Sequence, residues 1–353
     1  METIRRYFKF LLILSFGFIF QNINLFAQAS TEDSILFTSD FFDSDEPLKI
    51  SLEFNIKKYM NEKSDTVYLP AKLGYYISDT FKIEKEVRVK PRGISRLRHC
   101  HMPPIWLNIK KSNIKDDFIS DSKKVKIVTL CRVNNEYTKY LLKEYLIYKL
   151  YNIITEKSFR VRLLKINYID TGRKNKSNTH WAFMIEPENL LAERIEALPI
   201  KVDDLNYRHT DSTAADIMCF FQYMIGNTDF TVNGRHNVKL YKSKDHTKPL
   251  LIPIPYDFDF AGLISAEYAN PADILDIERV AQRYFLGLCR SDSQYLKLMD
   301  LFEEKKDEMY GFVNSFEYLD ERSRKVTLKY LDEFYDEMKH PKFIDKKLKR
   351  TCR

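Results

Sequence analysis

Alternating apolar and polar residues mark several strands in the first half of the chain. From Leu48 to Ile56 every second residue is apolar, which is typical of a strand with one buried face. Shorter apolar segments predict further strands at 67–69, 73–77, 87–90, 105–110 and 123–128, a strand pair over 158–170, and a strand over 181–186. We therefore expect an antiparallel sheet whose exposed face is polar.

Helical spacing of apolar residues is more frequent towards the C-terminus. It predicts helices over 140–154, 190–197, 213–226, 274–288, 293–311 and 317–337. The two patterns together indicate an α+β protein, with a β-rich region over 30–198 and a mainly helical region over 199–353. A break near Pro199 is the candidate boundary between them.

Composition indicates a folded chain with a sizeable core. The 353 residues are 44% hydrophobic and 14% aromatic, which is unlike a disordered protein. Lys and Arg number 57 and Asp and Glu 50, a mild excess that gives a net charge of +7. No nucleic-acid-binding motif accompanies this excess, so we expect a solvated surface of mixed charge and no nucleic-acid partner.

The N-terminus has the pattern of a secretory signal peptide. Arg5, Arg6 and Lys9 precede the apolar segment 10–20, and Ala27-Gln28-Ala29 offers small residues for cleavage. We assign residues 1–29 to this signal and expect a periplasmic or extracellular protein. No later segment approaches the roughly 20 apolar residues that a transmembrane helix needs.

Five cysteines follow the predicted cleavage site, and an oxidising compartment favours disulfides. Cys219 lies in an apolar helical segment, so we assign it to the core. We predict that Cys100 pairs with Cys131 and that Cys289 pairs with Cys352. A zinc site is the weaker alternative, because the chain has no CxxC and the His residues around Cys100 have no matching second group.

Candidate chemistry concentrates between Met224 and Gly262. Asp229 follows a predicted helix, Asn237 opens a predicted strand, and Asp257 and Asp259 end the next strand. A hairpin would bring these side chains to one end, where an Asn and carboxylates can hold Mg²⁺ against phosphates. The competing interpretation is structural, because Asp and Asn are common in turns.

Three motifs carry a resemblance to a known family. Gly226-Asn227-Thr228-Asp229 and Pro255-Tyr256-Asp257-Phe258-Asp259 resemble the CotH (spore coat protein H) kinase-like family and, more distantly, the HipA-type kinases. Arg92-Gly93-Ile94-Ser95-Arg96 resembles the family's upstream Arg-Gly motif. The resemblance spans roughly residues 85–265. It implies a two-lobed atypical protein-kinase-like fold, with the small lobe within 30–198 and the large lobe, with its catalytic-type hairpin, within 199–353.

The resemblance also implies a magnesium site. Asp229 matches the catalytic Asp, Asn237 and Asp257 match the two metal ligands, and Asp259 is a second ligand or helper. The implied cofactors are Mg²⁺ and ATP, and the implied activity is phosphate transfer to a protein or envelope acceptor.

The implied nucleotide contacts lie earlier in the chain. Lys126 would meet the phosphates and Glu144 would pair with it, and the base would lie against Met184–Glu188, which includes Glu186. Arg92 belongs to the segment Arg92–Arg98, which is either a phosphate clamp or a structural loop whose Arg pair with nearby acids. The alternative for Lys126 and Glu144 is an exposed Lys and an exposed helical Glu.

Two departures from the kinase pattern leave alternatives open. Asn237 comes eight residues after Asp229, whereas kinases place the Asn about five residues later, so Asn233 is a rival ligand. No glycine-rich GxGxxG loop occurs among the 9 Gly. One alternative is a noncatalytic envelope module that binds acidic or phosphorylated ligands through Arg92–Arg98. Another is a metal-dependent hydrolase that uses the same carboxylates.

Overall fold

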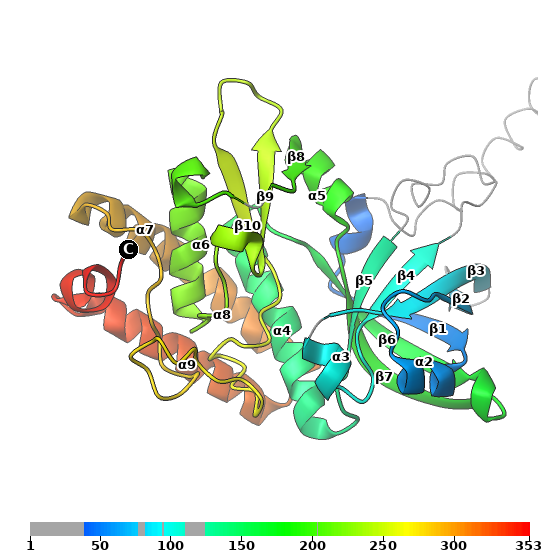
Figure 1. Ribbon diagram of the computed structural model, residues 1–353. Coiled ribbons are helices and arrows are strands. Elements are labelled where there is room, and N and C mark those ends of the chain that lie inside the picture. Colours follow the sequence, from blue (N-terminus) through cyan, green and yellow to red (C-terminus); the bar gives the residue numbers. More distant parts are fainter. Residues whose placement is uncertain (1–38, 77–81, 94, 110–123, 203) are drawn as a thin grey trace, which may run out of the picture.

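The computed structural model describes residues 39–76, 82–93, 95–109, 124–202 and 204–353. The predicted signal peptide at 1–29 lies outside these residues. A β-barrel forms one side of the molecule and helices form the other, with the long helix α4 (Asn135–Ile154) running between them (Figure 1).

Seven strands form a closed barrel in the order β1-β2-β3-β4-β5-β7-β6. Neighbouring strands are antiparallel except β1 and β6, which run parallel and close the barrel, with Leu48 opposite Leu164 and Phe54 opposite Asp170. The strands are β1 (Leu48–Phe54), β2 (Leu69–Tyr76), β3 (Lys82–Pro91), β4 (Ile105–Ile109), β5 (Lys124–Thr129), β6 (Val161–Asp170) and β7 (Lys176–Ile185).

The closed barrel shows that the expected two-lobed atypical protein-kinase-like fold is wrong. Strands and helices are both present, but the predicted antiparallel sheet is a mixed barrel. Alternation along a strand identifies its buried face, and it carries no information about which distant strand lies beside it. The pairing of β1 with β6 therefore had no local signal.

Two features hold β1 beside β6 where the barrel closes: the burial of β1 side chains and the hydrogen bonds of Asp170. Ile50, Leu52 and Phe54 of β1 are buried in the barrel core, as their alternation predicts. At the end of β6, the Asp170 carboxylate accepts hydrogen bonds from the backbone N–H of Ile56, at 3.0 Å, and from that of Lys57. These donors begin α2 (Ile56–Glu62), whose first N–H groups would otherwise lack partners.

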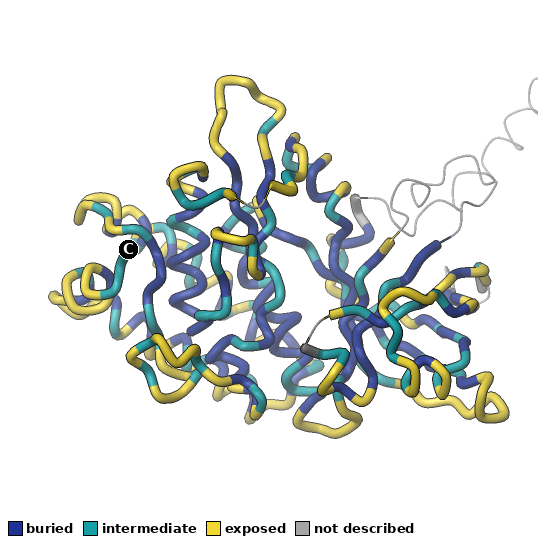
Figure 2. Tube along the Cα trace, viewed as in Figure 1, coloured by how far each residue is buried: buried dark blue, intermediate teal, exposed yellow. Residues whose placement is uncertain are grey.

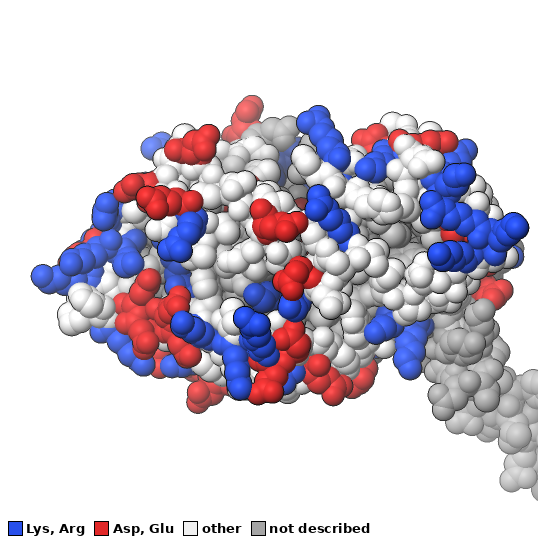
Figure 3. Space-filling view, turned by 90° about the horizontal axis from the view of Figure 1, so that it is seen from below, with Lys and Arg blue, Asp and Glu red and all other residues white. Residues whose placement is uncertain are grey.

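A second hydrophobic core joins the outside of the barrel to the helices. The helix α4 begins at the capping residue Asn134, whose side chain accepts the N–H of Tyr137, and most of its residues are buried (Figure 2). The other α-helices are α3 (Ser95–His99), α5 (Glu188–Arg194), α6 (Ser212–Met224), α7 (Asp292–Glu304), α8 (Lys306–Ser315) and α9 (Glu321–Lys339). Seen from below, basic and acidic side chains are intermixed on the surface (Figure 3).

Single turns complete the secondary structure. They are the 3₁₀ turns η2 (Ser39–Phe42), η4 (Thr171–Arg173), η5 (Tyr207–His209) and η6 (Asn233–Arg235), and the π-helical turn η7 (Ile344–Lys349).

The helix predicted over 274–288 is wrong, because this described segment contains only turns, bends and residues without regular secondary structure. Ile274, at its start, is 87% exposed. Side-chain contacts fix the segment instead: the Arg283 guanidinium donates to the backbone carbonyl of Met224 at 3.1 Å and also to that of Tyr330.

A three-stranded sheet in the order β10-β9-β8 lies above α4 in Figure 1. Its strands are β8 (Ala197–Ile200), β9 (Val238–Ser243) and β10 (Leu251–Pro255). Pro199 lies within β8, opposite Tyr241. The division of the chain at 198 and 199 stays a prediction.

Both predicted disulfides are confirmed. Cys100 is bonded to Cys131 and Cys289 to Cys352, and the remaining Cys219 is buried. The disulfides are compatible with an exported protein. Within the described ranges, no helix is both long enough and apolar enough to span a membrane.

Candidate functional site

The β9–β10 hairpin brings the ends of two strands together, as the sequence predicts. Val238 pairs with Pro255, and the backbone N–H of Tyr256 donates to the Asn237 carbonyl at 3.0 Å. Asn237 and Asp257 both have left-handed backbones, with φ of 52° and 64°. Asn and Asp adopt this conformation more readily than most residues, which gives both positions a structural requirement besides any chemical role.

Asp229 lies beside the start of this hairpin. The Asn237 side-chain amide donates to the Asp229 backbone carbonyl at 2.8 Å and to its carboxylate at 3.0 Å. His236 Nε2 is 2.8 Å from the other carboxylate oxygen. Asn233 is exposed at the start of η6, so Asn237 is the one of the two rival residues that contacts Asp229.

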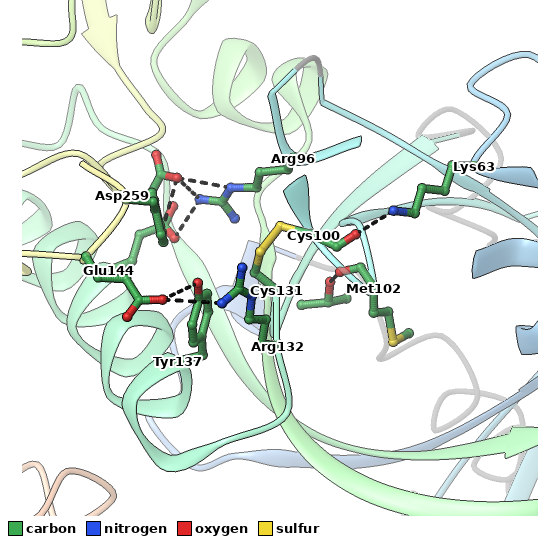
Figure 4. Close-up of a disulfide and its surroundings, with 12 residues drawn as sticks. Lys63, Arg96, Cys100, Met102, Cys131, Arg132, Tyr137, Glu144 and Asp259 are labelled. Carbon is green, nitrogen blue, oxygen red and sulfur yellow. Dashed lines mark hydrogen bonds and ion pairs between the residues drawn. A yellow bond between two sulfur atoms is a disulfide. The ribbon is translucent and has the colours of Figure 1, made fainter. Parts of the chain in front are cut away.

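Three carboxylates converge on one arginine close to the hairpin end. Arg96 lies 2.9 Å from Asp259 (Figure 4). It also lies 3.1 Å from Glu144 and 3.4 Å from Asp257. Arg96 and its three partners are called the acidic cluster below. The cluster has one positive charge for three acids, and Glu144 and Asp259 are buried.

Neighbouring elements fix the acidic cluster. The Tyr148 hydroxyl of α4 accepts the backbone N–H of Asp257 at 2.8 Å. Arg96 lies on the short helix α3, and the next residue after that helix is Cys100, bonded to Cys131 just ahead of α4. The backbone N–H of His101 also donates to the Cys131 carbonyl at 2.9 Å. The disulfide thus holds α3 against the N-terminal end of α4, the helix that carries Glu144.

Burial and mutual repulsion shift the pKa values of the acids. Burial, opposed by Arg96 and reinforced by Asp257 and Glu144, raises the pKa of Asp259 to about 8. Burial raises the pKa of Glu144 as well, although Arg96 opposes it. For Asp257, burial is outweighed by Arg96 and Arg92, which hold the pKa below its usual value. Asp257 is the member best placed to stay ionised, and its side chain is 35% exposed.

A second set of charges lies around Tyr256. Lys126 of β5 is 3.1 Å from Glu188, and Lys239 of β9 is 3.4 Å from the same carboxylate. The two ammonium groups lie 5.2 and 5.3 Å from the centre of the Tyr256 ring. Lys126, Lys239, Glu188 and Arg92 are called the basic cluster below.

Arg92 joins the basic cluster through a shared aromatic ring. Its guanidinium lies 5.7 Å from the centre of the Trp106 ring, and the Lys126 ammonium lies 5.5 Å from the same centre. Burial lowers the pKa of Lys126 to about 8, opposed by Glu188 and reinforced by Arg92 and Lys239. Lys126 and Lys239 therefore share one carboxylate, and Arg92 adds a third positive charge near Lys126.

The ion pairs of Glu144 and Glu186 differ from the predicted contacts of these residues. Glu144 contacts Arg96, whereas Lys126 pairs with Glu188, so the expected Lys126–Glu144 pair does not form. Glu186 is not brought to the hairpin end. Its carboxylate is fully buried between Arg160, at 3.1 Å, and Arg194, at 2.8 Å, which satisfy it as a structural ion pair.

Sequence reasoning missed three contributors. Arg96 was identified only as part of a surface clamp, and nothing in the sequence links it to Asp257, 161 residues later. His236 directly precedes Asn237 and could have been found as a neighbour of a candidate residue. Glu188 ends the segment Met184–Glu188 that was expected to lie against the base, and its pairing with Lys126 was not foreseen.

The carboxylates of the acidic cluster can hold Mg²⁺ only if the ion shares them with Arg96. Among the residues that the structure describes, no three His, Cys, Asp or Glu side chains are arranged to hold a metal ion. Mg²⁺ usually keeps several waters and needs only one or two carboxylates beside substrate phosphates. Asp257 offers an accessible carboxylate, and the buried Glu144 Oε1 has no hydrogen-bond partner among the described residues. The residues fit the ion if Arg96 shares the cluster with it.

Comparison with known proteins adds no assignment. No protein-family model matches the chain, and no curated protein matches it. The resemblance to the CotH kinase-like family stays a prediction, as do the roles that it implies for individual residues.

Proposed function

We propose that the protein binds a magnesium nucleotide at the end of the β9–β10 hairpin and transfers phosphate to a protein or envelope acceptor. One observation carries the proposal: an acid-rich cluster that includes Asp257 lies next to a lysine-rich cluster around the preceding residue, Tyr256. A metal–phosphate complex has the complementary arrangement, because the cation needs carboxylates and the phosphates need cations.

Each cluster has a defined part in the proposal. Asp257, helped by Asn237 and Asp259, would hold Mg²⁺, which neutralises phosphate charge when bound. Lys126 and Lys239 bind and orient the phosphates from the basic side. Arg96 keeps the acidic cluster partly neutral, so the site retains a counter-charge without the ion.

Asp229 is the proposed residue for the acceptor hydroxyl. Its carboxylate is 37% exposed, so an acceptor can reach it. Asn237 and His236 each contact one carboxylate oxygen and fix the orientation of the group. A positioned carboxylate of this kind takes or orients the proton of the attacking hydroxyl.

The test is calorimetric titration of the purified protein with Mg-ATP. Asp257→Asn retains the shape and tolerates the positive φ at this position, so the fold is expected to persist. We expect saturable binding to the unmodified protein and at least about tenfold weaker binding to this variant. Asp245→Asn is the matched control, because Asp245 is exposed in the turn of the same hairpin.

Equal affinities in Asp257→Asn and the unmodified protein would exclude Asp257 from the site. The absence of saturable binding at millimolar nucleotide would reject the proposal as a whole.

A noncatalytic binding module is the second candidate. Arg96 favours it, because a guanidinium within 3.4 Å of all three carboxylates neutralises part of the charge that would attract a metal ion. This candidate predicts binding of phosphorylated or acidic ligands that does not depend on Mg²⁺, with no phosphate transfer from labelled ATP. Transfer that disappears in Asp229→Asn would exclude it.

Export completes the proposal. The disulfides support an oxidising location, and the segment 1–29 is the proposed signal. Sequencing the N-terminus of the protein recovered from the cell envelope or medium is expected to find a start near Gln28 or Ser30. A protein that retains Met1 would contradict cleavage.

A further inference from the structure

A cavity of about 1230 Å³ lies away from the hairpin end, behind the loop that follows Asp259. Its walls come from α9, from η7 and from the turns between Asp276 and Phe285, and α4 contributes Lys143. Its volume exceeds the roughly 300–1,000 Å³ usual for small-molecule sites, so it has room for a ligand with several groups.

The charged residues of the lining are mainly basic. They are Lys143, Arg279, Arg283, Lys329, Lys346, Lys347 and Arg350, against Asp276, Glu333 and Glu337. Neighbouring groups already occupy some of them: Lys347 lies 3.4 Å from Glu337, and Arg350 lies 3.5 Å from Asp276.

Three of the remaining cations have side chains without a polar partner. Across the described part of the chain, no ion pair or hydrogen bond involves the side chain of Arg279, Lys329 or Lys346. They come from three different elements around the cavity, and the only acid of the lining that is likewise unpaired is Glu333. The free charge of the lining is therefore positive.

Lys143 makes the strongest case for a ligand. It is only 8% exposed, and its ammonium donates to the Leu263 carbonyl at 3.1 Å. An ammonium has three donors, yet no carboxylate among the described residues lies within ion-pair distance of this one. A buried charge is usually paired, because leaving water without a counter-charge is costly. A bound anion would supply the missing partner.

We infer that this cavity binds a polyanionic small molecule carrying two or more phosphate or carboxylate groups. Lys143 contacts one group at the inner wall, and Arg279, Lys329 and Lys346 contact the others near the rim. The inference does not depend on the proposed function, because none of these residues belongs to the acidic or the basic cluster.

The experiment is calorimetric titration without Mg²⁺ at 0.15 M salt, with linear triphosphate as one probe and citrate as the other. We expect saturable binding of at least one probe. Tighter binding of triphosphate would assign the site to phosphorylated ligands, and tighter binding of citrate to polycarboxylates. Binding that vanishes at this salt concentration would overturn the inference, because only screened surface attraction would explain it.

Variants locate the bound anion. Lys143→Met keeps the length of the side chain and removes its charge, and we expect about tenfold weaker binding or more. The double variant Lys329→Gln/Lys346→Gln is expected to weaken binding about three- to tenfold without a change in thermal stability. Lys339→Gln is the control, because Lys339 lies on α9, is 62% exposed and does not line the cavity.

Equal losses in the control and the double variant would overturn the inference. If Lys143→Met does not fold, the double variant still decides the result, because its residues lie near the rim. Lys126→Met should leave triphosphate binding to this cavity unchanged, whereas binding at the hairpin end would weaken, which separates the two sites.

Discussion

The acidic cluster, which includes Asp257, and the basic cluster around the preceding residue, Tyr256, have opposite imbalances of charge. Three carboxylates share Arg96 in the acidic cluster, whereas Lys126 and Lys239 share Glu188 in the basic cluster, with Arg92 as a third cation nearby. Each cluster contains one ion of the opposite charge, Arg96 among the acids and Glu188 among the bases. This ion lowers the free-energy cost of burying the other charges of its cluster. A site that stays folded without ligand and still attracts both a cation and an anion needs this partial compensation.

Removing Arg96, the cation of the acidic cluster, should have the largest effect on the stability of the protein. Arg96→Met leaves three carboxylates without a counter-charge, so we expect the free energy of unfolding to fall by about 3–5 kcal/mol. Urea denaturation at pH 7 measures this value. Arg98→Met, an exposed change on the same helix α3, is the control and should cost under about 0.5 kcal/mol. Similar losses in both variants would mean that the cluster contributes no more than the helix surface.

Removing the charge of Lys126, one of the cations of the basic cluster, should change Mg-ATP binding more than stability. Lys126→Met is expected to weaken Mg-ATP binding about tenfold or more, because a lysine then no longer meets the phosphates. Lys124→Met, an exposed lysine on the same strand β5, is the control. Unchanged affinity in Lys126→Met would remove the basic cluster from the proposed site.

The pH dependence of binding tests the same lysine. Because the pKa of Lys126 is lowered to about 8, with Glu188, Arg92 and Lys239 facing it, the side chain is charged below pH 8 and loses its charge above it. We expect Mg-ATP affinity to be constant from pH 6.5 to 7.5 and to fall up to about tenfold by pH 9. In Lys126→Arg the fall should be absent, since a guanidinium stays charged. A fall that persists in this variant would assign the titration to another group.

Asp229→Asn should have the smallest effect on binding and stability. Asp229 is 37% exposed and belongs to neither cluster, so we expect Mg-ATP affinity within about twofold and a stability change under about 1 kcal/mol. Calorimetry and urea denaturation give both values. A loss as large as that of Lys126→Met would show that Asp229 contributes to nucleotide binding.

Local patterns were sufficient for the hairpin and for the choice of Cys219 as the unpaired cysteine. The turn between β9 and β10 and the apolar segment around Cys219 are both readable within a short window of sequence. Arg96 shows where this information ends. Its partners come from α4 and from the loop after β10, and only the folded chain brings them together. The segment 274–288 failed for a related reason: side-chain contacts to distant carbonyls replaced a helix that its local pattern favoured.

The parallel pairing of β1 with β6 also imposes an order on folding. Until residues 161–170 have been made, β1 has only one of its two strand neighbours, and its other edge is open to pairing with a second chain. Contacts between segments so distant in sequence form slowly, because the intervening chain must first be ordered. The free edge of β1 is therefore open to aggregation until β6 pairs with it, and protection of that edge is expected to raise the yield of folded molecules.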